Sequence, residues 1–221
     1  MRINFKSHKF GKKLLISSAA VMMLSGVTTT IVPKQSGLIQ TVQASSKMIK
    51  LGKYSKDNQC VLKFDPRTKT LHIKEGANDN TLGSTPIYQL IPTANRHLSK
   101  KRKIKLTDIK HISIDSEIAL PGNCYWLFGK LPSLQDIQGL DKIDSSNVDS
   151  AESMFAHDKK LKKLDLSTWD SRSLGFGNKE GMFYKDLALE EVNVTGWDVK
   201  LGDSIFNGLD TTKTRIIGVN K

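Results

Sequence analysis

The stretch MFAHDKKLKKLDLSTWD, residues 154–170, decides the fold, because a matching stretch, MFYKDLALEEVNVTGWD, follows at residues 182–198. Each copy places apolar side chains 6, 9, 11 and 14 positions after its phenylalanine. These residues are Leu161, Leu164, Leu166 and Trp169 after Phe155, and Leu189, Val192, Val194 and Trp197 after Phe183. Matches at identical offsets are typical of a repeat protein, in which similar turns of the chain stack on one another.

The repeat extends in both directions from this pair. Toward the N-terminus, Phe128 is followed by Leu134 and Ile137 at offsets 6 and 9, before an inserted Gly-Leu pair at 139–140 shifts the register. Toward the C-terminus, Phe206 stands 23 residues after the previous phenylalanine, whereas the earlier spacings are 27 and 28 residues. The sequence therefore predicts a short array of stacked turns.

Alternation inside each copy predicts which side chains are buried. Leu164 and Leu166 stand two positions apart, so in a strand they face the same way, while Lys163 and Asp165 face the other way. One turn cannot bury its apolar face alone, but stacked turns form a continuous core with parallel strands on one side. Residues 147–157 are predicted to return on the opposite side as a helical turn. The expected fold class is therefore α/β, a short leucine-rich-repeat solenoid.

The two repeat tryptophans allow two interpretations. As exposed rings, Trp169 and Trp197 would stack against a sugar. Their identical offsets favour the other interpretation, in which both belong to the core between neighbouring turns.

Upstream of the repeats, the sequence predicts a small β-rich region that caps the array. Residues 60–65 and 70–74 alternate in hydropathy around a turn at residues 66–69, which is typical of a hairpin. A third strand is expected within residues 109–115. The predicted domain organisation is a signal peptide at 1–44, a flexible leader at 45–58, the β-rich region at 59–122, and repeats with a C-terminal cap at 123–221.

The first 44 residues have the order of a secretory signal peptide. A basic segment, residues 2–13, precedes a mostly apolar segment, residues 14–32, and the small-residue site Val42-Gln43-Ala44 predicts cleavage between Ala44 and Ser45. Serines and threonines within the apolar segment disfavour a membrane anchor. Neither a lipoprotein cysteine nor a sortase motif is present, so we expect a secreted, cell-surface-associated protein without a membrane span or covalent anchor.

Composition fits a folded and moderately basic protein. Hydrophobic residues make up 38% of the chain and charged residues 25%, which excludes a disordered low-complexity protein. The net charge is +12. Residues 1–44 contain six basic residues and no acidic one, so their removal lowers this charge to +6.

Two cysteines are too few for a disulfide-rich scaffold or a four-cysteine zinc site. In an exported chain, Cys60 and Cys124 allow one disulfide. A pair of buried free thiols is the alternative, and the sequence leaves both open.

A run of five cationic residues lies between the predicted strands of the β-rich region. Such runs bind anionic polymers or surfaces, or form a solvated basic loop. Export makes an intracellular nucleic acid an unsuitable target, so we expect no nucleic-acid partner and consider anionic cell-wall polymers instead. The run consists of Lys100, Lys101, Arg102, Lys103 and Lys105.

The repeat resembles the BspA-like leucine-rich-repeat family of surface proteins of Gram-positive, Lactobacillus-type bacteria. The family pattern is roughly M-F-x5-L-x2-L-D-L-S-x-W-D-T-S-x-V, and the two quoted stretches carry most of it. Asp144-Ser-Ser-Asn-Val148 stands where the family has D-T-S-N-V. The resemblance covers residues 110–206 and is more specific for the fold than for the function. It implies adhesion to a protein or glycan partner.

No catalytic or metal-binding motif is present. The chain lacks H-E-x-x-H, G-x-S-x-G, P-loop and G-x-G-x-x-G patterns, and its histidines are scattered. We therefore expect no enzyme, catalytic residue, metal or cofactor, and retain an exported hydrolase only as a remote alternative.

Two functions remain from the sequence. The first is a surface interaction protein that reads its partner with outward strand residues, namely Lys163, Asp165, Glu191 and Asn193. The second is an envelope protein that the basic run holds electrostatically on anionic wall polymers, with the repeats serving as structure.

Overall fold

The computed structural model describes residues 22–24, 27–29, 47–52, 57–172 and 178–220. The chain divides into two compact units, Met1–Lys47 and Met48–Lys221. In the first unit, β1 (Met22–Leu24) pairs antiparallel with β2 (Val27–Thr29). The predicted cleavage site, Ala44 and Ser45, lies outside the described residues. The second unit holds the β-rich region and the repeats.

The second unit consists of short strands, 3₁₀ turns and one α-helix among its described residues. No described helix combines the length and the apolar character needed to cross a bilayer. In chain order, the elements are β3 (Ile49–Lys50), β4 (Val61–Asp65), β5 (Thr70–Lys74), α1 (Ile87–Asn95), η2 (Lys100–Arg102), η3 (Leu106–Asp108), β6 (His111–Ile114), β7 (Ile118–Ala119), β8 (Asp136–Gln138), η4 (Leu140–Lys142), β9 (Ile143–Asp144), β10 (Lys163–Asp165), β11 (Glu191–Asn193), η5 (Ser204–Phe206) and β12 (Arg215–Ile217).

The predicted hairpin is present and lies beside an additional edge strand. β4 and β5 pair antiparallel, with Phe64 opposite Leu71, and both side chains are buried. β3 pairs antiparallel with β4 and contributes Ile49 to the core. Part of the segment expected as a flexible leader is therefore a strand, because its apolar residues Ile49 and Leu51 find a buried position against the hairpin.

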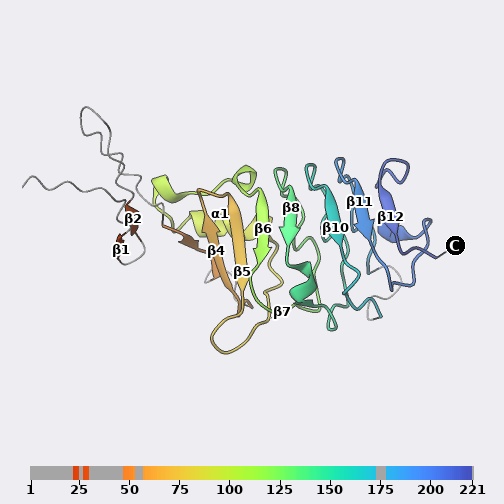
Figure 1. Ribbon diagram of the computed structural model, residues 1–221, viewed down its shortest axis with the longest axis horizontal. Coiled ribbons are helices and arrows are strands. Elements are labelled where there is room, and N and C mark those ends of the chain that lie inside the picture. Colours follow the sequence, from red (N-terminus) through yellow and green to blue (C-terminus); the bar gives the residue numbers. More distant parts are fainter. Residues whose placement is uncertain (1–21, 25–26, 30–46, 53–56, 173–177, 221) are drawn as a thin grey trace, which may run out of the picture. The chain divides into compact units, whose positions relative to one another are not determined.

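Parallel strands continue from the hairpin into the repeats (Figure 1). One sheet has the order β3-β4-β5-β6-β8, and a second has the order β10-β11-β12. β5, β6 and β8 are parallel, as are β10, β11 and β12. Between the sheets, the Lys162 amide donates to the Gln135 carbonyl at 3.4 Å. The solenoid is confirmed, and its sheet crosses the expected boundary at residue 122 without a break.

Stacked phenylalanines form the centre of the repeat core. Phe128, Phe155, Phe183 and Phe206 are all buried. Successive ring centroids lie 5.7, 6.1 and 6.2 Å apart, and neighbouring rings are within 19° of parallel. Residues at the same offset in successive turns therefore form straight rows, as the repeat alignment predicted.

The side opposite the strands differs from the expected helices. Residues 151–157 form tight turns in which Ser153 and His157 have φ of 55° and 67°, in the left-handed region. An α-helix cannot continue through such residues. Their backbone instead bonds to the next turn, as when the Phe155 amide donates to the Met182 carbonyl at 3.0 Å. The α/β expectation is thus corrected to a mostly β solenoid.

Candidate interaction surface

The outward side chains of the strands form two rows across the second unit, which together we call the strand face. Strand pairing sets the rows, because directly paired residues point the same way. The first row is Thr70, His111, Asp136, Lys163, Glu191 and Arg215, and the second is His72, Ser113, Gln138, Asp165, Asn193 and Ile217.

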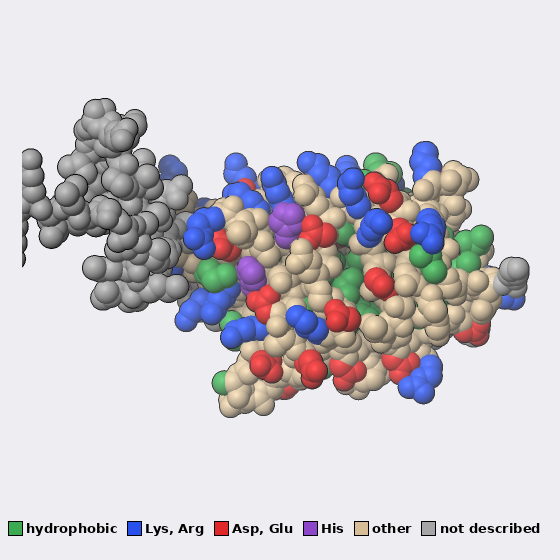
Figure 2. All heavy atoms as spheres, in the orientation of Figure 1, with side chains coloured by type: hydrophobic (Ala, Val, Ile, Leu, Met, Phe, Trp, Pro, Cys, Tyr) green, Lys and Arg blue, Asp and Glu red, His purple; other side chains and the backbone are tan. Residues whose placement is uncertain are grey.

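Charges alternate along the first row and pair with one another. His111 Nδ1 lies 2.7 Å from Asp136 Oδ2, and Glu191 is paired with Lys163 at 3.7 Å and with Arg215 at 2.9 Å. Blue and red side chains are accordingly interspersed over this side of the molecule (Figure 2). The strand face therefore has little excess charge of either sign.

Two residues of the second row close the bend that follows their strands, β10 and β11. Asp165 Oδ1 accepts hydrogen bonds from the Ser167 amide at 3.1 Å and hydroxyl at 2.7 Å. Asn193 Oδ1 accepts the corresponding bonds from Thr195 at 3.1 and 2.7 Å. Both predicted contact residues thus have a local structural role, and Asp165 is exposed while Asn193 is partly exposed.

A shallow, open groove of about 560 Å³ lies on this side of the solenoid, where three successive turns meet. It brings together Gln135, Asp136, Lys160, Lys162, Lys163 and Ala188. Of the four predicted contact residues, Lys163 lines the groove. Glu191 is connected to it through its ion pair with Lys163, whereas Asp165 and Asn193 stand in the neighbouring row.

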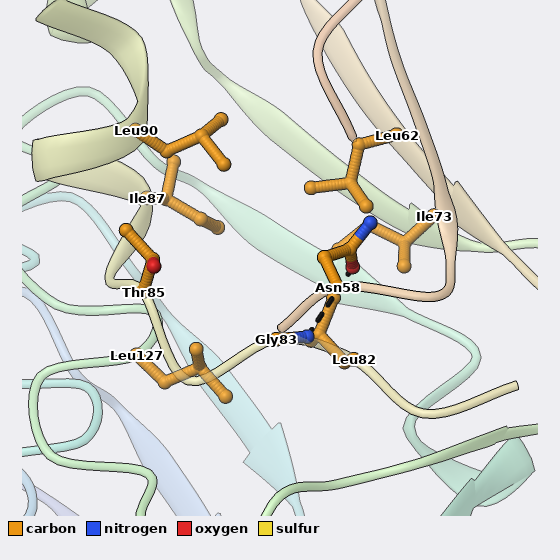
Figure 3. Close-up of a pocket in the computed structure, with 9 residues that line it drawn as sticks. All are labelled: Asn58, Leu62, Ile73, Leu82, Gly83, Thr85, Ile87, Leu90 and Leu127. Carbon is orange, nitrogen blue, oxygen red and sulfur yellow. Dashed lines mark hydrogen bonds between the residues drawn. The ribbon is translucent and has the colours of Figure 1, made fainter. Parts of the chain in front are cut away.

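A second cavity, near α1, is too small for a ligand. It measures about 10 Å³ and lies between α1 and the hairpin, with Ile87 and Leu90 facing Leu62 and Ile73 (Figure 3). The Asn58 side chain accepts a hydrogen bond from the Gly83 amide at its edge, at 3.2 Å. One water molecule needs about this much space, so the cavity is a packing gap.

The basic run is fixed at its base and exposed along its length. Ile104 is buried, and its backbone amide and carbonyl both bond to the Asn95 side chain, at 2.9 and 2.6 Å. The five cationic residues from Lys100 to Lys105 are exposed, and within the described ranges none forms an ion pair. Because Asn95 is the last residue of α1, these bonds fix the run beside that end of the helix.

The structure places both cysteines as free, buried thiols, so the disulfide that the sequence left open is not formed. Cys60 Sγ donates to the Asn80 carbonyl at 3.0 Å, and Cys124 Sγ donates to the Pro121 carbonyl at 3.1 Å. Burial, with smaller contributions from Asp79 and Asp149 respectively, raises the pKa of each thiol to about 12.

We expect these thiols to be unreactive in the native protein. Because the thiolate is the nucleophile, a raised pKa and burial together should slow reaction with a disulfide reagent at pH 8 at least about 100-fold relative to the unfolded chain. Thiol titration in buffer and in denaturant measures this difference. Rapid modification of either cysteine in buffer would contradict the buried placement.

The described residues hold no group of three His, Cys, Asp or Glu side chains that could bind a metal ion. The carboxyls with the largest upward pKa shifts, Asp158 and Asp186, are 0% and 3% exposed. A dissolved substrate cannot reach them, so this pair offers no acid or base to a hydrolase.

The repeat tryptophans belong to the core, as their offsets predicted. Trp169 is 6% exposed and Trp197 is 3% exposed. Each indole N–H donates to a carbonyl of the preceding turn, Leu140 at 3.0 Å and Leu166 at 3.1 Å. Neither ring is open to a sugar.

A different set of aromatic residues lies at the surface and was not predicted from the sequence. Trp126, His157 and Tyr184 come from three successive turns and have neighbouring rings. A search of the residues immediately flanking each core phenylalanine would have found them, since they stand within two positions of Phe128, Phe155 and Phe183.

No family model matches the chain, and no curated protein or solved structure matches it significantly.

Proposed function

We propose that the chain is an exported, surface-associated interaction protein of the BspA-like leucine-rich-repeat type, which binds a protein or glycan partner through the strand face. The observation that carries the proposal is the continuity of that face. Two rows of side chains, all polar except Ile217, run along β5, β6 and β8 and along β10, β11 and β12, and they border an open groove. Solenoids present extended surfaces of this kind to their partners.

Internal pairing of the charges favours a specific partner over a simple polyanion. Glu191 pairs with both Lys163 and Arg215 and offsets part of their positive charge, so long-range attraction to a highly charged polymer is weakened on this face. Recognition there depends instead on shape and on matched hydrogen bonds.

Filling the groove tests the proposal. Ala188 is partly exposed in the groove, so Ala188→Arg should obstruct it and weaken partner binding at least tenfold. Its stability should change by no more than about 0.5 kcal/mol, as is usual for surface substitutions. The partner is first recovered by pull-down from host extracellular-matrix and bacterial wall fractions, and its affinity is then measured for each variant.

Thr168→Arg is the matched control, because it adds the same side chain at an exposed position that does not line the groove. The control should bind as the parent does. Equal binding by both variants and the parent would show that the groove is not the contact surface.

The exposed basic run supports a second candidate, electrostatic retention on anionic wall polymers. A salt wash separates the two, because charge-held proteins elute as ions screen the attraction. Retention that survives the wash, and is lost in Ala188→Arg, supports the strand face. Retention that the salt wash abolishes, and that depends only on Lys100, Lys101, Arg102 and Lys103, supports the wall-polymer alternative.

A further inference from the structure

The repeat turns have corners in the left-handed backbone region, two residues after each core phenylalanine and, in the first three turns, also two residues before it. The first corner is occupied by Trp126, Ser153 and Gly181, with φ of 57°, 55° and 54°. The second is occupied by Lys130, His157, Lys185 and Gly208, with φ of 60°, 67°, 60° and 75°.

Glycine is the residue that these corners accommodate without strain. The chain uses it at Gly181 and Gly208, where the Cβ of any other residue at 208 would overlap the Tyr184 ring. Trp126, Lys130, His157 and Lys185 instead occupy corners at a conformational cost. Strained residues of this kind gather where their side chains have a function.

Side chains at these corners, together with Tyr88 of α1 and Tyr184 beside Phe183, form one continuous surface strip, which we call the corner row. It consists of Tyr88, Trp126, Lys130, His157, Tyr184 and Lys185. The ring centroids are 6.5 Å apart from Tyr88 to Trp126, 5.6 Å from Trp126 to His157, and 5.5 Å from His157 to Tyr184. The row therefore crosses several turns with a nearly even spacing.

Cationic groups accompany the rings. Lys130 Nζ lies 4.0 Å from the Trp126 ring centroid and 4.6 Å from that of Tyr88, and Lys185 Nζ lies 5.0 Å from the Tyr184 centroid. Both lysines are exposed, as is nearby Lys159, and none of the three joins an ion pair with a described residue. Lys162 and Lys163, which line the groove on the strand side, are by contrast paired with Glu190 and Glu191.

The environment of His157 reflects this concentration of positive charge. Partial burial, followed by Lys185, Lys130 and Lys159, lowers the pKa of its imidazole. The ring lies between those of Trp126 and Tyr184, at centroid distances of 5.6 and 5.5 Å. Tyr184 remains 37% exposed beside it, and Tyr125, next to Trp126, is 46% exposed.

We propose that the corner row binds an anionic glycan, with sugar rings against Trp126, His157 and Tyr184 and acidic groups on Lys130 and Lys185. Aromatic faces suit the apolar faces of sugar rings, and unpaired lysines suit carboxylate or sulfate groups. The ring spacing is close to the length of one sugar unit in an extended chain. An acidic peptide would use only the lysines, and a neutral glycan only the rings. This site goes beyond the strand face and does not depend on it.

Tryptophan fluorescence reports on the site directly. Of the three tryptophans, Trp126 alone is more than slightly exposed, because Trp169 and Trp197 are in the core. Heparin oligosaccharide should therefore change the emission of the folded protein and protect it from quenching by acrylamide. Heparin binding without any change in emission would place the contact elsewhere and overturn the proposal.

Glycine substitutions separate binding from folding. The double variant Lys130→Gly/Lys185→Gly relaxes two strained corners, so its melting temperature should be unchanged or higher, while its affinity for heparin should fall about tenfold. Lys69→Gly is the matched control, since Lys69 has φ of 61° in the β4–β5 turn, away from the corner row. Equal heparin affinity in the double variant and the parent would overturn the proposal.

Two further polymers identify the chemistry. Dextran, a neutral glycan, and polyglutamate, a polyanion without sugars, should each bind more weakly than heparin. If polyglutamate bound as tightly as heparin, the corner row would be a simple charge patch, and the proposal of a glycan site would be wrong. Ala188→Arg should bind heparin normally, so a failure of the strand-face proposal remains distinguishable from a failure of this one.

Discussion

Replacing Leu164 by Asp is expected to abolish cooperative folding of the repeats. Leu164 is 2% exposed in β10 and is paired in register with Val192 of β11. The substitution removes a buried side chain, which costs about 2–5 kcal/mol, and adds a carboxylate with no partner in the core. The combined effect approaches the total stability of a typical domain, about 5–15 kcal/mol.

Circular dichroism and thermal melting measure this loss. Thr168→Asp introduces the same charge at an exposed position nearby and should melt within a few degrees of the parent. If Leu164→Asp melted as the parent does, the inward direction of the strand residues would be wrong, and with it the assignment of the strand face.

Lowering the pH from 8 to about 4 is expected to stabilise the protein, because two carboxyls are buried between turns. The Leu131 amide donates to Asp158 Oδ1, and the Asp158 amide donates to Asp186 Oδ1, each at 2.7 Å. The second oxygen of each carboxyl is buried without a partner. Burial raises the pKa of Asp186 to about 8, and burial together with Asp186 raises the pKa of Asp158 well above its usual range.

The sign of the effect follows from proton counting. Between about pH 4 and 8 the unfolded chain ionises Asp186 while the folded protein keeps it protonated, so the folded state binds more protons. The free energy of unfolding therefore falls as the pH rises through this window, by about 1.4 kcal/mol per pH unit for each such carboxyl. Below it, Asp170 and Asp210, whose pKa values are lowered to about 2 by Arg172 and Lys213 respectively, reverse the trend.

Asparagine in place of either buried aspartate tests this explanation. Asp186→Asn keeps the acceptor for the Asp158 amide and cannot ionise, so it should stabilise the protein at pH 7.5 by several kcal/mol and flatten the pH dependence. Asp149→Asn, at an exposed carboxyl, should do neither. The measurement is urea denaturation across this pH range. A parent protein that is most stable at pH 8 would refute the protonated state of the pair.

Equal offsets in the sequence were sufficient to predict the core of the solenoid. The direction of Leu164 and Val192, the stacking of the phenylalanines and the burial of Trp169 all follow from one requirement, that neighbouring turns place like residues in contact. The hairpin was also predictable, because its alternation and its turn are local signals.

Other features depend on contacts that are distant in sequence. The spacing of Ile87, Leu90, Ile91 and Ala94 is helical, but Pro92 within it disfavours a helix on local grounds. Strand β3 exists only because β4 offers it an edge. The left-handed corners arise from hydrogen bonds between turns, as when the Lys130 amide donates to the Ala156 carbonyl at 2.9 Å. The positions of Trp126 and His157 beside the core phenylalanines are visible in the sequence, but the contact between their rings depends on these bonds.

The near-parallel stack of phenylalanines has a consequence for how such a chain can evolve. Each turn presents the same shape to the turn that follows as to the turn that precedes it. A duplicated unit of 27 or 28 residues could therefore be inserted between two turns without a change in the contacts they make. The corner row and the strand face would each gain one position in the same step. Copy number alone would then set the length of ligand that the protein can span, and the gain in avidity would require no new recognition chemistry.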